Sequence, residues 1–501
     1  MNKKYCILSM NQMKSENTCD IFEVSPFDIG IPLVDISDET IKEIYYYRWH
    51  NFCSHIKNTP LGYIVTEFTP SVSWEGPYGS IVCPAGHHMY EGRWLHNKEY
   101  MDQYARFWFK EDVDPFQYSM WFADAIYGIC KVTGDFSLAE SLYENLKENY
   151  DSWEKKCRLS KRSQLLYQID DDDGMEFSAS GNGCRPTINS YQYGDAVALS
   201  KIAERLGKIK EKEYYENEYN MQKNKIDSCM WDKDSSFYKN IKNGYWLCDI
   251  REIMGYIPWY FNLPDEDKNE AWKFLNDENY FYAPFGPTTA EQNHPDFMKN
   301  YPHMCLWNGP SWPFATSQTL TALGNFLCNY KQDIIRKTDY FKLLKLYAQS
   351  QYDTDENGAK TPYIDENLDP YTGEWLARKI MREGNYDEFD KTRGVHYNHS
   401  TFCDLVLTGL AGIRARDDEM IEINPLFEED DLEYFCADGI LYHNHYIAVL
   451  WDKTGKKYHK GAGLKVYIDG ILKAESSKII KIVLEKQTTQ GEGSIVLSPE
   501  I

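Results

Sequence analysis

The feature of this 501-residue chain that most constrains its fold is a long series of helical hairpins. Between about residues 38 and 415, apolar residues recur every three or four positions, which is the spacing of an amphipathic helix. Short breaks, such as those at Gly134 and Gly207, separate ten or more predicted helices without a strand pattern between them. An open solenoid would show a repeat of fixed length, and the chain has none. The pattern therefore predicts a mainly α protein in which six hairpins close into an (α/α)6 toroid.

The two ends of the chain differ in pattern from this helical region. Ser37, followed by two acidic residues, is expected to cap the first helix, which leaves residues 1–37 as an N-terminal extension. After residue 417, β-branched and aromatic runs are joined by tight turns such as that at Asp469 and Gly470. We expect residues 38–417 to form the helical barrel and residues 418–501 to form a small C-terminal β-domain.

The charge and hydropathy of the chain exclude several partners. Lys and Arg total 54 against 77 Asp and Glu, so a net charge of −23 removes the basic surface that nucleic acid needs. No apolar run approaches the roughly 20 residues of a membrane span, and the run after Lys4 is too short for a signal peptide. We expect a cytoplasmic protein with no nucleic-acid or membrane partner. Its oligomeric state is left open.

Sequence motifs for metal and cofactor binding are missing. The 13 cysteines are scattered without a Cys-x-x-Cys pair, so we expect buried thiols rather than disulfides or zinc ligands. The segment 85–94 contains His87 and His88, but no His-Glu-x-x-His motif completes a metal site. Gly-rich phosphate loops, dinucleotide fingerprints and Gly-x-Ser-x-Gly elbows do not occur either. We predict no metal and no cofactor.

Aromatic residues and long loops indicate a carbohydrate substrate instead. The chain is 15% aromatic, with 39 Tyr and 14 Trp, and flat rings with a polar edge suit pockets that stack on sugar faces. Long loops in compact proteins are usually functional. Four long segments rich in Gly, Pro, Trp, His and carboxylates are predicted to be irregular, at 60–97, 168–190, 276–311 and 352–397.

The densest group of carboxylates lies in the second of these segments. Four consecutive Asp residues precede the run Gly-Met-Glu-Phe-Ser at 174–178. Acidity alone is equally typical of a solvated loop, and a calcium loop is disfavoured because Ile169 and Ser180 stand at two ligand positions of an EF-hand. Between a methionine and a phenylalanine, however, a carboxyl group is in an apolar setting that raises its pKa. Glu176 is therefore the candidate general acid.

Three motifs in order resemble those of one clan of glycosidases. The run at 174–178 is similar to the Gly-Trp-Asp-Phe-Ser stretch that holds the general acid in trehalases. The run Trp-Asn-Gly-Pro-Ser-Trp-Pro at 307–313 resembles the clan's Trp-Arg-Gly-Pro-Val-Trp segment. Residues 366–373 resemble the Glu-Asn-Tyr-Asp-Pro-x-Thr-Gly signature of the general base, and 397–402 stand where an aromatic segment opens the last barrel helix. Over roughly residues 38–415 the chain thus resembles the clan G (α/α)6-barrel glycoside hydrolases, among them trehalase, processing α-glucosidase I and, nearest in type, mannosylglycerate hydrolase.

The resemblance implies an inverting, exo-acting glycoside hydrolase that cleaves a terminal bond, α-linked and gluco- or manno-configured. Such a reaction needs one carboxyl group that protonates the leaving oxygen and a second that deprotonates a water on the opposite sugar face. By the resemblance these roles fall to Glu176 and Glu366. The residues that it implies around the bound sugar are Glu91, Arg93, Trp94, Asp173, Arg185, Trp307, Asn308, Gly309, Trp312 and His399.

The chain departs from the clan pattern around the acid. A glutamate replaces the family aspartate, and the arginine that follows the motif is missing, a position for which Arg185 is the expected substitute. If the acid motif is misaligned, Asp172, Asp173 or Asp195 becomes the acid. Two other functions stay open: phosphorolysis, which needs a single acid and phosphate as the nucleophile, and sugar binding without turnover.

Overall fold

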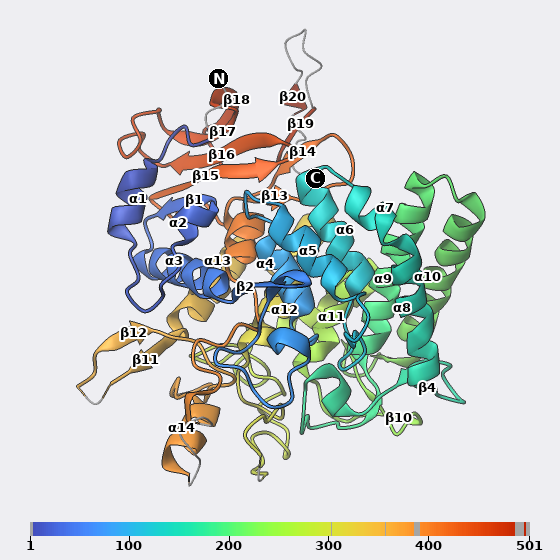
Figure 1. Ribbon diagram of the computed structural model, residues 1–501. Helices are drawn as coiled ribbons and strands as arrows, with labels where there is room; N and C mark the ends of the chain where they lie inside the picture. The colour runs from blue at the N-terminus through green and yellow to red at the C-terminus, as the bar shows by residue number, and fades with distance from the viewer. Residues whose placement is uncertain (1–3, 302, 356, 385–390, 486–494, 497–501) are drawn as a thin grey trace.

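The computed structural model describes residues 4–301, 303–355, 357–384, 391–485 and 495–496, and it is mainly helical (Figure 1). A layer of β-strands lies across one end of the helical body, at the top of this view. The helices are α1 (Met10–Glu16), α2 (Pro26–Ile29), α3 (Glu39–Ser54), α4 (Ala85–Gly92), α5 (Glu99–Phe107), α6 (Phe122–Thr133), α7 (Ser137–Ser141), α8 (Tyr143–Lys156), α9 (Pro186–Arg205), α10 (Ile209–Cys229), α11 (Ile257–Tyr260), α12 (Pro313–Asn329), α13 (Lys337–Gln349), α14 (Leu376–Glu383) and α16 (Cys403–Leu405), the last continued by a π-helical turn over Val406–Leu410.

Six helices contact one another in a closed circuit. In this ring α4 contacts α6, α6 contacts α9, α9 contacts α11, α11 contacts α12, α12 contacts α16, and α16 contacts α4. Other helices lie outside the ring, with α8 and α10 against α9, and α13 against α12 and α3. The burial follows this arrangement, because α9 buries 16 of its 20 residues whereas α10 buries only Tyr215 and Ile226 of its 21. A helix buried on all sides belongs to a core, and a helix with one buried stripe covers it.

The ends of the helices follow their capping residues. Helix α3 begins after Asp38, whose side chain accepts a hydrogen bond from the Ile41 N–H, so Asp38 and not Ser37 is the cap. Helix α6 ends at Gly134 in the left-handed conformation (φ 69°), and Gly207 (φ 68°) separates α9 from α10. The helix predicted over 209–230 is α10.

Two segments predicted to be irregular contain a helix: 60–97 contains α4, a helix of the ring, and 352–397 contains α14. All eight residues of α4 are buried, including His87, His88 and Glu91. Because no face of this helix is exposed, its sequence shows no alternation of polar and apolar faces, and the helical period is hidden. His88 and Glu91 are hydrogen-bonded inside the core, whereas Nε2 of His87 is buried without a hydrogen-bond partner in the described residues.

The strands at the end of the helical body form two sheets. The five-stranded sheet has the order β1-β15-β16-β17-β18 and the four-stranded sheet has the order β13-β14-β19-β20. The predicted turn at Asp469 and Gly470 joins β17 to β18, and both residues have positive φ. The strands of the two sheets are β1 (Leu33–Ile36), β13 (Ile413–Arg414), β14 (Ile421–Ile423), β15 (Tyr434–Tyr442), β16 (His445–Asp452), β17 (Gly463–Ile468), β18 (Ile471–Ser476), β19 (Ile482–Leu484) and β20 (Ile495–Val496).

The N-terminal segment contributes to the larger sheet. Strand β1 pairs antiparallel with β15, from Leu33 opposite Asp438 to Ile36 opposite Phe435. Part of residues 1–37 therefore belongs to a sheet otherwise built from the C-terminal segment, a pairing that the sequence pattern did not reveal. The division of the chain at residues 37 and 417 stays a prediction, and residues 486–494 and 497–501 of the expected β-domain lie outside the described residues.

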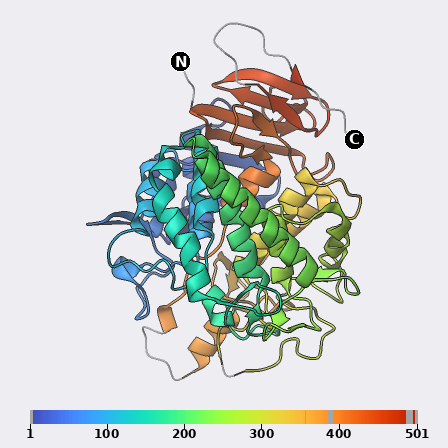
Figure 2. The ribbon, with the colours of Figure 1, turned by 90° about the vertical axis from the view of Figure 1, so that its right-hand side faces the viewer.

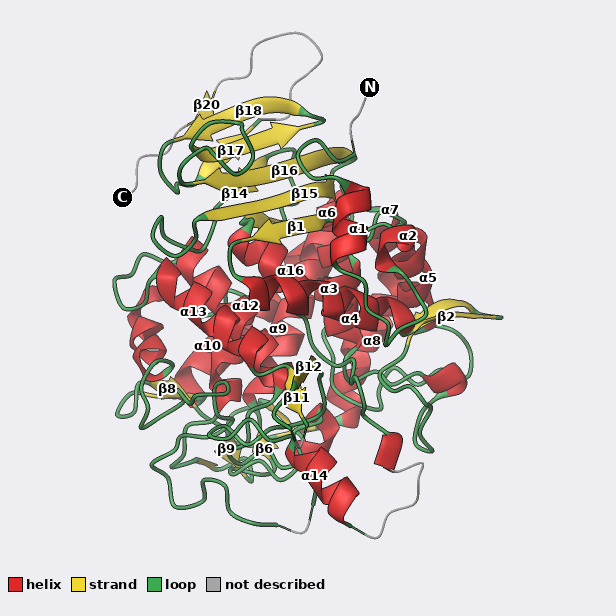
Figure 3. Ribbon diagram, turned by 90° about the vertical axis from the view of Figure 1, so that its left-hand side faces the viewer, coloured by secondary structure: helices red, strands yellow, loops and turns green. Residues whose placement is uncertain are grey.

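Irregular loops and short strand pairs gather at the end of the helical body opposite the two sheets (Figures 2 and 3). The short strands are β2 (Ile56–Thr59), β3 (Gly62–Val65), β4 (Arg158–Leu159), β5 (Leu166–Tyr167), β6 (Gly183–Cys184), β7 (Trp231–Asp232), β8 (Phe237–Tyr238), β9 (Ile241–Lys242), β10 (Trp246–Leu247), β11 (Tyr352–Thr354) and β12 (Lys360–Pro362), and 3₁₀ turns span Pro77–Gly79, Asp170–Asp173, Ile253–Tyr256 and Glu266–Phe274. Many of the loops come from the predicted irregular segments, whereas β4, β5 and β7 to β10 lie outside them. The loops position the candidate site.

The pairing of β1 predicts the effect of a core substitution. Ile36 is fully buried at this edge of the sheet, so Ile36→Ala is expected to lower the free energy of unfolding by about 2–5 kcal/mol. Ile471, on β18 of the same sheet, is 59% exposed, and Ile471→Ala is the matched control with an expected loss within about 0.5 kcal/mol. Urea denaturation of both variants measures the difference. Equal shifts of the two unfolding midpoints would show that β1 does not stabilise the fold.

Candidate active site

The two glutamates predicted to be catalytic line one pocket, at the end of the ring where its helices begin. The pocket has a volume of about 270 Å3. Cys83 shortly precedes α4, Tyr118 precedes α6, Trp312 is the N-cap of α12 and Tyr397 precedes α16. Helix starts expose N–H groups and carry partial positive charge, which favours carboxylates nearby. The other lining residues are Glu67, Phe68, Trp74, Ile81, Gly174, Glu176, His303, Cys305, Glu366 and Arg393.

Glu176 lies on a tight turn beside the four aspartates. Gly174, in the left-handed conformation (φ 71°), ends the 3₁₀ turn of these aspartates. The backbone carbonyl of Glu176 accepts a hydrogen bond from the Trp307 N–H at 3.1 Å. Burial and then the charge of Glu366 raise the pKa of Glu176 to about 8. A carboxyl group that keeps its proton at neutral pH meets the requirement for a general acid.

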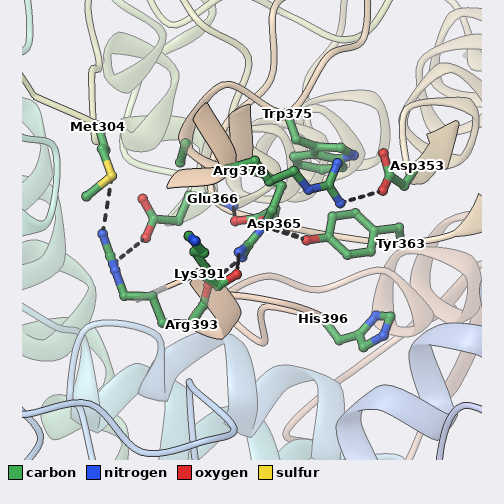
Figure 4. A network of polar contacts seen from close by, with 12 residues as sticks. Met304, Asp353, Tyr363, Asp365, Glu366, Trp375, Arg378, Lys391, Arg393 and His396 are labelled. Carbon is green, nitrogen blue, oxygen red and sulfur yellow. Dashed lines mark hydrogen bonds and ion pairs between the residues drawn. The ribbon is translucent and has the colours of Figure 1, made fainter. Parts of the chain in front are cut away.

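Glu366 reaches the same pocket from the segment that follows β12, and it is held by two partners (Figure 4). The Arg393 guanidinium donates to Oε1 at 3.1 Å and the Cys305 thiol donates to Oε2 at 2.9 Å. Arg393 also contacts the sulfur of Met304 at 3.6 Å. An ion pair with arginine favours the ionised form of a carboxyl group. The partners of Glu366 therefore suit a carboxylate that accepts a proton.

Behind Glu366 its chain neighbour Asp365 forms a separate buried ion pair. The Arg378 guanidinium donates to Asp365 at 2.8 Å, and the Tyr363 hydroxyl donates to the same oxygen at 2.6 Å. Burial raises the pKa of Asp365 to about 6 although the charge of Arg378 lowers it. The N–H of Glu366 donates to the other oxygen of Asp365 at 2.8 Å. This network fixes the backbone from which Glu366 projects.

A third carboxyl group in the pocket, Glu67, was missed by the sequence analysis. Glu67 lies shortly after β3, and its Oε1 accepts a short hydrogen bond from the Tyr397 hydroxyl. Burial, opposed by this hydrogen bond and reinforced by the charge of Glu366, raises the pKa of Glu67 to about 8. The pocket thus contains two carboxyl groups that hold protons at neutral pH and one that is paired with an arginine.

The predicted site residues Asp173 and Arg185 lie beneath the pocket rather than in it. Both side chains are fully buried and form an ion pair at 2.6 Å, and Thr187 donates a second hydrogen bond to Asp173. Arg185 also donates to Ser178, in the turn that holds Glu176, at 2.8 Å. The pair therefore supports the backbone of the turn that holds Glu176. A buried ion pair of this kind loses stability when one partner is removed.

The alternative acids lie outside the pocket as well. Asp195 is buried in α9 and its Oδ1 accepts a hydrogen bond from the Asp124 N–H at 3.0 Å, which caps the start of α6. Asp172 is half-buried and its backbone carbonyl accepts a hydrogen bond from the Ser119 N–H at 2.7 Å. Neither residue lines the pocket that contains Glu366.

Glu91, Arg93 and Trp94 are predicted to contact the bound sugar, but the structure places them away from the pocket. Glu91 accepts backbone hydrogen bonds at the start of α16, between 2.8 and 3.2 Å. Arg93 and the Trp94 indole both donate to Asp404 at 2.7 Å. None of the three lines the pocket, because α4 is a helix that runs away from it and not a loop.

Of the predicted residues at 307–312 and 399, only Trp312 lines the pocket. Trp307 stacks on Trp312 with ring centroids 4.3 Å apart and lies beneath it. His399 is buried beside Tyr397, with ring centroids 4.1 Å apart. Asn308 and Gly309 shape the loop: the Asn308 amide donates to the Lys299 carbonyl at 2.8 Å, and a Cβ at Gly309 (φ 154°) would lie 2.7 Å from a Met298 carbon.

The structure also bears on metal binding and on membrane-spanning helices. In the residues that it describes, no group of three or more His, Cys, Asp and Glu is placed to hold a metal ion. No helix within the described ranges is both long enough and apolar enough to cross a bilayer.

The geometry offers a small pocket with two protonated carboxyl groups, one arginine-paired carboxylate and aromatic walls from Trp74, Tyr118 and Trp312. Such a pocket can transfer protons to and from a bound polyhydroxylated ligand.

The raised pKa of Glu67 predicts a pH dependence of stability. An unfolded glutamate titrates at about 4.3, so Glu67, with a folded pKa of about 8, stabilises the fold below pH 4.3 and loses this contribution as pH rises through 8. Between pH 6 and pH 9 we expect the wild type to lose about 2.7 kcal/mol more stability than Glu67→Gln, because two pH units at about 1.4 kcal/mol each separate pH 6 from the folded pKa. For a chain of this size the Tm is then expected to fall by roughly 2–4 °C more than that of Glu67→Gln. The exposed Glu213→Gln is the control. Parallel curves for all variants, measured by calorimetry, would contradict the burial of a protonated Glu67.

Comparisons with known proteins place this chain in a family. A solved structure of a sialidase is 37% identical over 96% of this chain and 45% of its own, with a TM-score of 0.87. A solved α-L-rhamnosidase from Dictyoglumus thermophilum is 15% identical over 88% of this chain and 44% of its own, with a TM-score of 0.54, a likeness of fold alone. An uncharacterized protein of Borreliella burgdorferi is 29% identical over 114 residues, which are 23% of this chain and 24% of that protein.

The chain therefore spans less than half the length of these solved structures and about a quarter of that relative. The family match extends over residues 77–400, which is most of the chain, and it includes Glu176 and Glu366 but not Glu67. The glycoside hydrolase family that the three motifs predict is therefore confirmed. The chain belongs to the mannosylglycerate hydrolase MGH1-like glycoside hydrolase domain family.

Proposed function

We propose that this domain is an inverting exo-glycosidase that hydrolyses a terminal glycosidic bond, with Glu176 as the general acid and Glu366 as the general base. One observation carries the proposal. Two loops far apart in the sequence bring these carboxyl groups into one pocket, where burial holds the proton on Glu176 and Arg393 pairs with Glu366. A carboxyl group that keeps its proton, beside a second one that is paired with a cation, is the arrangement that the acid and the base of such a reaction need.

In the proposed reaction, Glu176 donates its proton to the glycosidic oxygen as the bond to the anomeric carbon breaks. Glu366 removes a proton from a water molecule, and the water oxygen attacks the anomeric carbon from the opposite face of the sugar. Arg393 and the Cys305 thiol orient the carboxylate of Glu366 toward that water. The products are a sugar of inverted anomeric configuration and the free aglycone. Both carboxyl groups return to their starting states by proton exchange with solvent.

The size and charge of the pocket support a neutral terminal sugar, which we propose to be α-linked and gluco- or manno-configured. A volume of about 270 Å3 is at the low end of small-molecule pockets, about 300–1,000 Å3, and suits one glycosyl unit. Three glutamates and a single arginine line it, and that arginine is already paired with Glu366. A sialic acid carries a carboxylate that needs unpaired cations. We therefore do not extend the sialidase name of the 37%-identical structure to this domain.

The binding roles follow from position. Trp312 and Trp74 are proposed to stack on the sugar, and Glu67 and Tyr397 to hydrogen-bond its hydroxyl groups, because all four line the pocket. The other predicted substrate residues are proposed not to touch the sugar. They are proposed to support the segment that holds Glu176, the segment 307–312 or the helix ring.

We also propose that the helices form an (α/α)6 toroid. A closed circuit of six helices, with other helices packed outside it, supports the (α/α)6 toroid predicted from the hairpin pattern. A cytoplasmic location and a carbohydrate as the binding partner also belong to the proposal. Phosphorolysis finds less support, because a phosphate nucleophile needs free cations and the pocket arginine is paired.

Removal of either catalytic carboxyl group is predicted to abolish most of the activity. We expect Glu176→Gln and Glu366→Gln to lower kcat by about 10²–10⁴-fold on disaccharides and glycosyl-glycerates, the range for general acid–base catalysis. Glu374→Gln, an exposed glutamate in the same loop as Glu366 that pairs with Lys379, is the control and is expected to keep full activity. Proton NMR of the released sugar, with and without phosphate, measures both turnover and anomer. Full activity of Glu366→Gln, retention of configuration or a requirement for phosphate would each refute the mechanism.

The pKa of Glu176 predicts the alkaline limb of the pH profile. Because the acid must be protonated, kcat is expected to fall as pH rises through about 8, where Glu176 loses its proton. A dinitrophenyl glycoside has a leaving group that needs no protonation, so Glu176→Gln is expected to regain activity on it and to lose the alkaline limb. If Glu176→Gln kept the limb, or gained nothing from the activated substrate, another group would be the acid.

A further inference from the structure

A second cavity lies at the opposite end of the helix ring from the active-site pocket. Its volume is about 310 Å3. Arg93 at the end of α4, Lys131 in the last turn of α6 and Asn329 at the end of α12 line it. On the side of the smaller sheet it is lined by Arg414 of β13 and Glu422 of β14. The two cavities share no lining residue, so this one is separate from the site of hydrolysis.

The charged side chains of this cavity are only partly paired with one another. Its cations are Arg93, Lys131, Arg414 and Arg416, and its carboxylates are Asp124, Asp404 and Glu422. Arg93 pairs with Asp404 and Arg416 pairs with Glu422, each at 2.7 Å. Cations are favoured here because the ring helices end at this side and their C-termini carry partial negative charge. Two cations are left without such a pair.

These two cations are Lys131 and Arg414. Arg414 donates to the Asn325 amide oxygen at 2.7 Å, and the Lys131 ammonium lies 5.8 Å from the centre of the Tyr127 ring. Within the described residues neither has a carboxylate within ion-pair distance. Burial lowers the pKa of Lys131, although the charge of Asp124 opposes this. Both cations can therefore accept an anionic partner that the chain itself does not supply.

Asp404 lines the same cavity and has a buried oxygen without a hydrogen-bond partner among the described residues. It is 1% exposed, and its Oδ1 accepts hydrogen bonds from Arg93 and Trp94. Its Oδ2 is buried and has no hydrogen-bond partner in the described part of the chain. A buried carboxylate oxygen without a donor is unfavourable. A group that donates a hydrogen bond would satisfy it.

The cavity is reached from an adjoining hollow of about 340 Å3. The residues that line both are Asp124, Lys131, Val197, Ala415 and Arg416. Lys201, which is 49% exposed, and Asp417 stand at the outer side of this hollow. A small polar molecule can thus approach Lys131 from the surface without passing through the active-site pocket.

We propose that this cavity binds a small hydroxylated anion, a sugar acid or a sugar phosphate. Lys131 and Arg414 hold its anionic group, and one of its hydroxyl groups donates to Oδ2 of Asp404. The proposal does not depend on the function proposed for the active-site pocket, because it concerns other residues at the other end of the ring.

Isothermal titration calorimetry of the full chain tests the chemistry of the ligand. Gluconate, glucose 6-phosphate and neutral glucose are the three probes. We expect at least one of the anions to bind at least 10-fold more tightly than glucose, and the stronger one identifies the sugar acid or the sugar phosphate as the natural class. No binding of either anion, or equal affinity for glucose, would overturn the proposal.

Variants locate the binding site. Arg414→Gln and Lys131→Gln are each expected to weaken binding of the preferred anion at least 10-fold, whereas Arg414→Lys keeps the charge and most of the affinity. Lys210→Gln, which removes an exposed lysine on α10, is the control and should change nothing. Glu366→Gln should also leave anion binding unchanged. Loss of binding in Glu366→Gln with retention in Arg414→Gln and Lys131→Gln would assign the anion to the active-site pocket and refute the second site.

Discussion

The helix ring depends on reciprocal hydrogen bonds between its first and last helices. Glu91 of α4 accepts the backbone N–H groups of residues 402–404 at the start of α16, where three buried donors would otherwise have no partner. Asp404 in turn accepts from Arg93 and Trp94 at the end of α4. Glu91 thus satisfies the start of α16, and Asp404 holds the two side chains that follow α4. Because the segment before α16 carries Tyr397 into the pocket, the closure of the ring also sets the shape of the site.

The ring helices also give the two ends of the domain opposite electrostatic character. Their starts surround the pocket, where the partial positive charge of the N–H groups favours the glutamates. Their ends surround the second cavity, where the carbonyl groups favour cations such as Arg93 and Lys131. The field of the helix starts attracts carboxylates to the pocket, while burial is what raises the pKa of Glu67 and Glu176. The separation of the two cavities along the ring keeps an anion at one end away from the glutamates at the other.

The sequence predicts those parts of this structure that depend on local pattern. The hairpin spacing indicates the helices, and the short motifs around Glu176 and Glu366 identify two carboxyl groups that do meet in one pocket. Residues whose roles depend on which distant segments meet were not predictable. Glu67 stands in no motif, and Arg393 becomes a partner of Glu366 only when the loops fold together. Glu91 was misplaced for the same reason, since a buried helix without a polar face reads as a loop.

The segment 303–312 links the two glutamates for which we propose catalytic roles. At one side of this segment, the Trp307 N–H donates to the backbone carbonyl of Glu176. At the other side, the Cys305 thiol donates to the carboxylate of Glu366 at 2.9 Å. One connecting segment therefore contacts both Glu176 and Glu366, and Trp307 stacks on Trp312 at the start of α12.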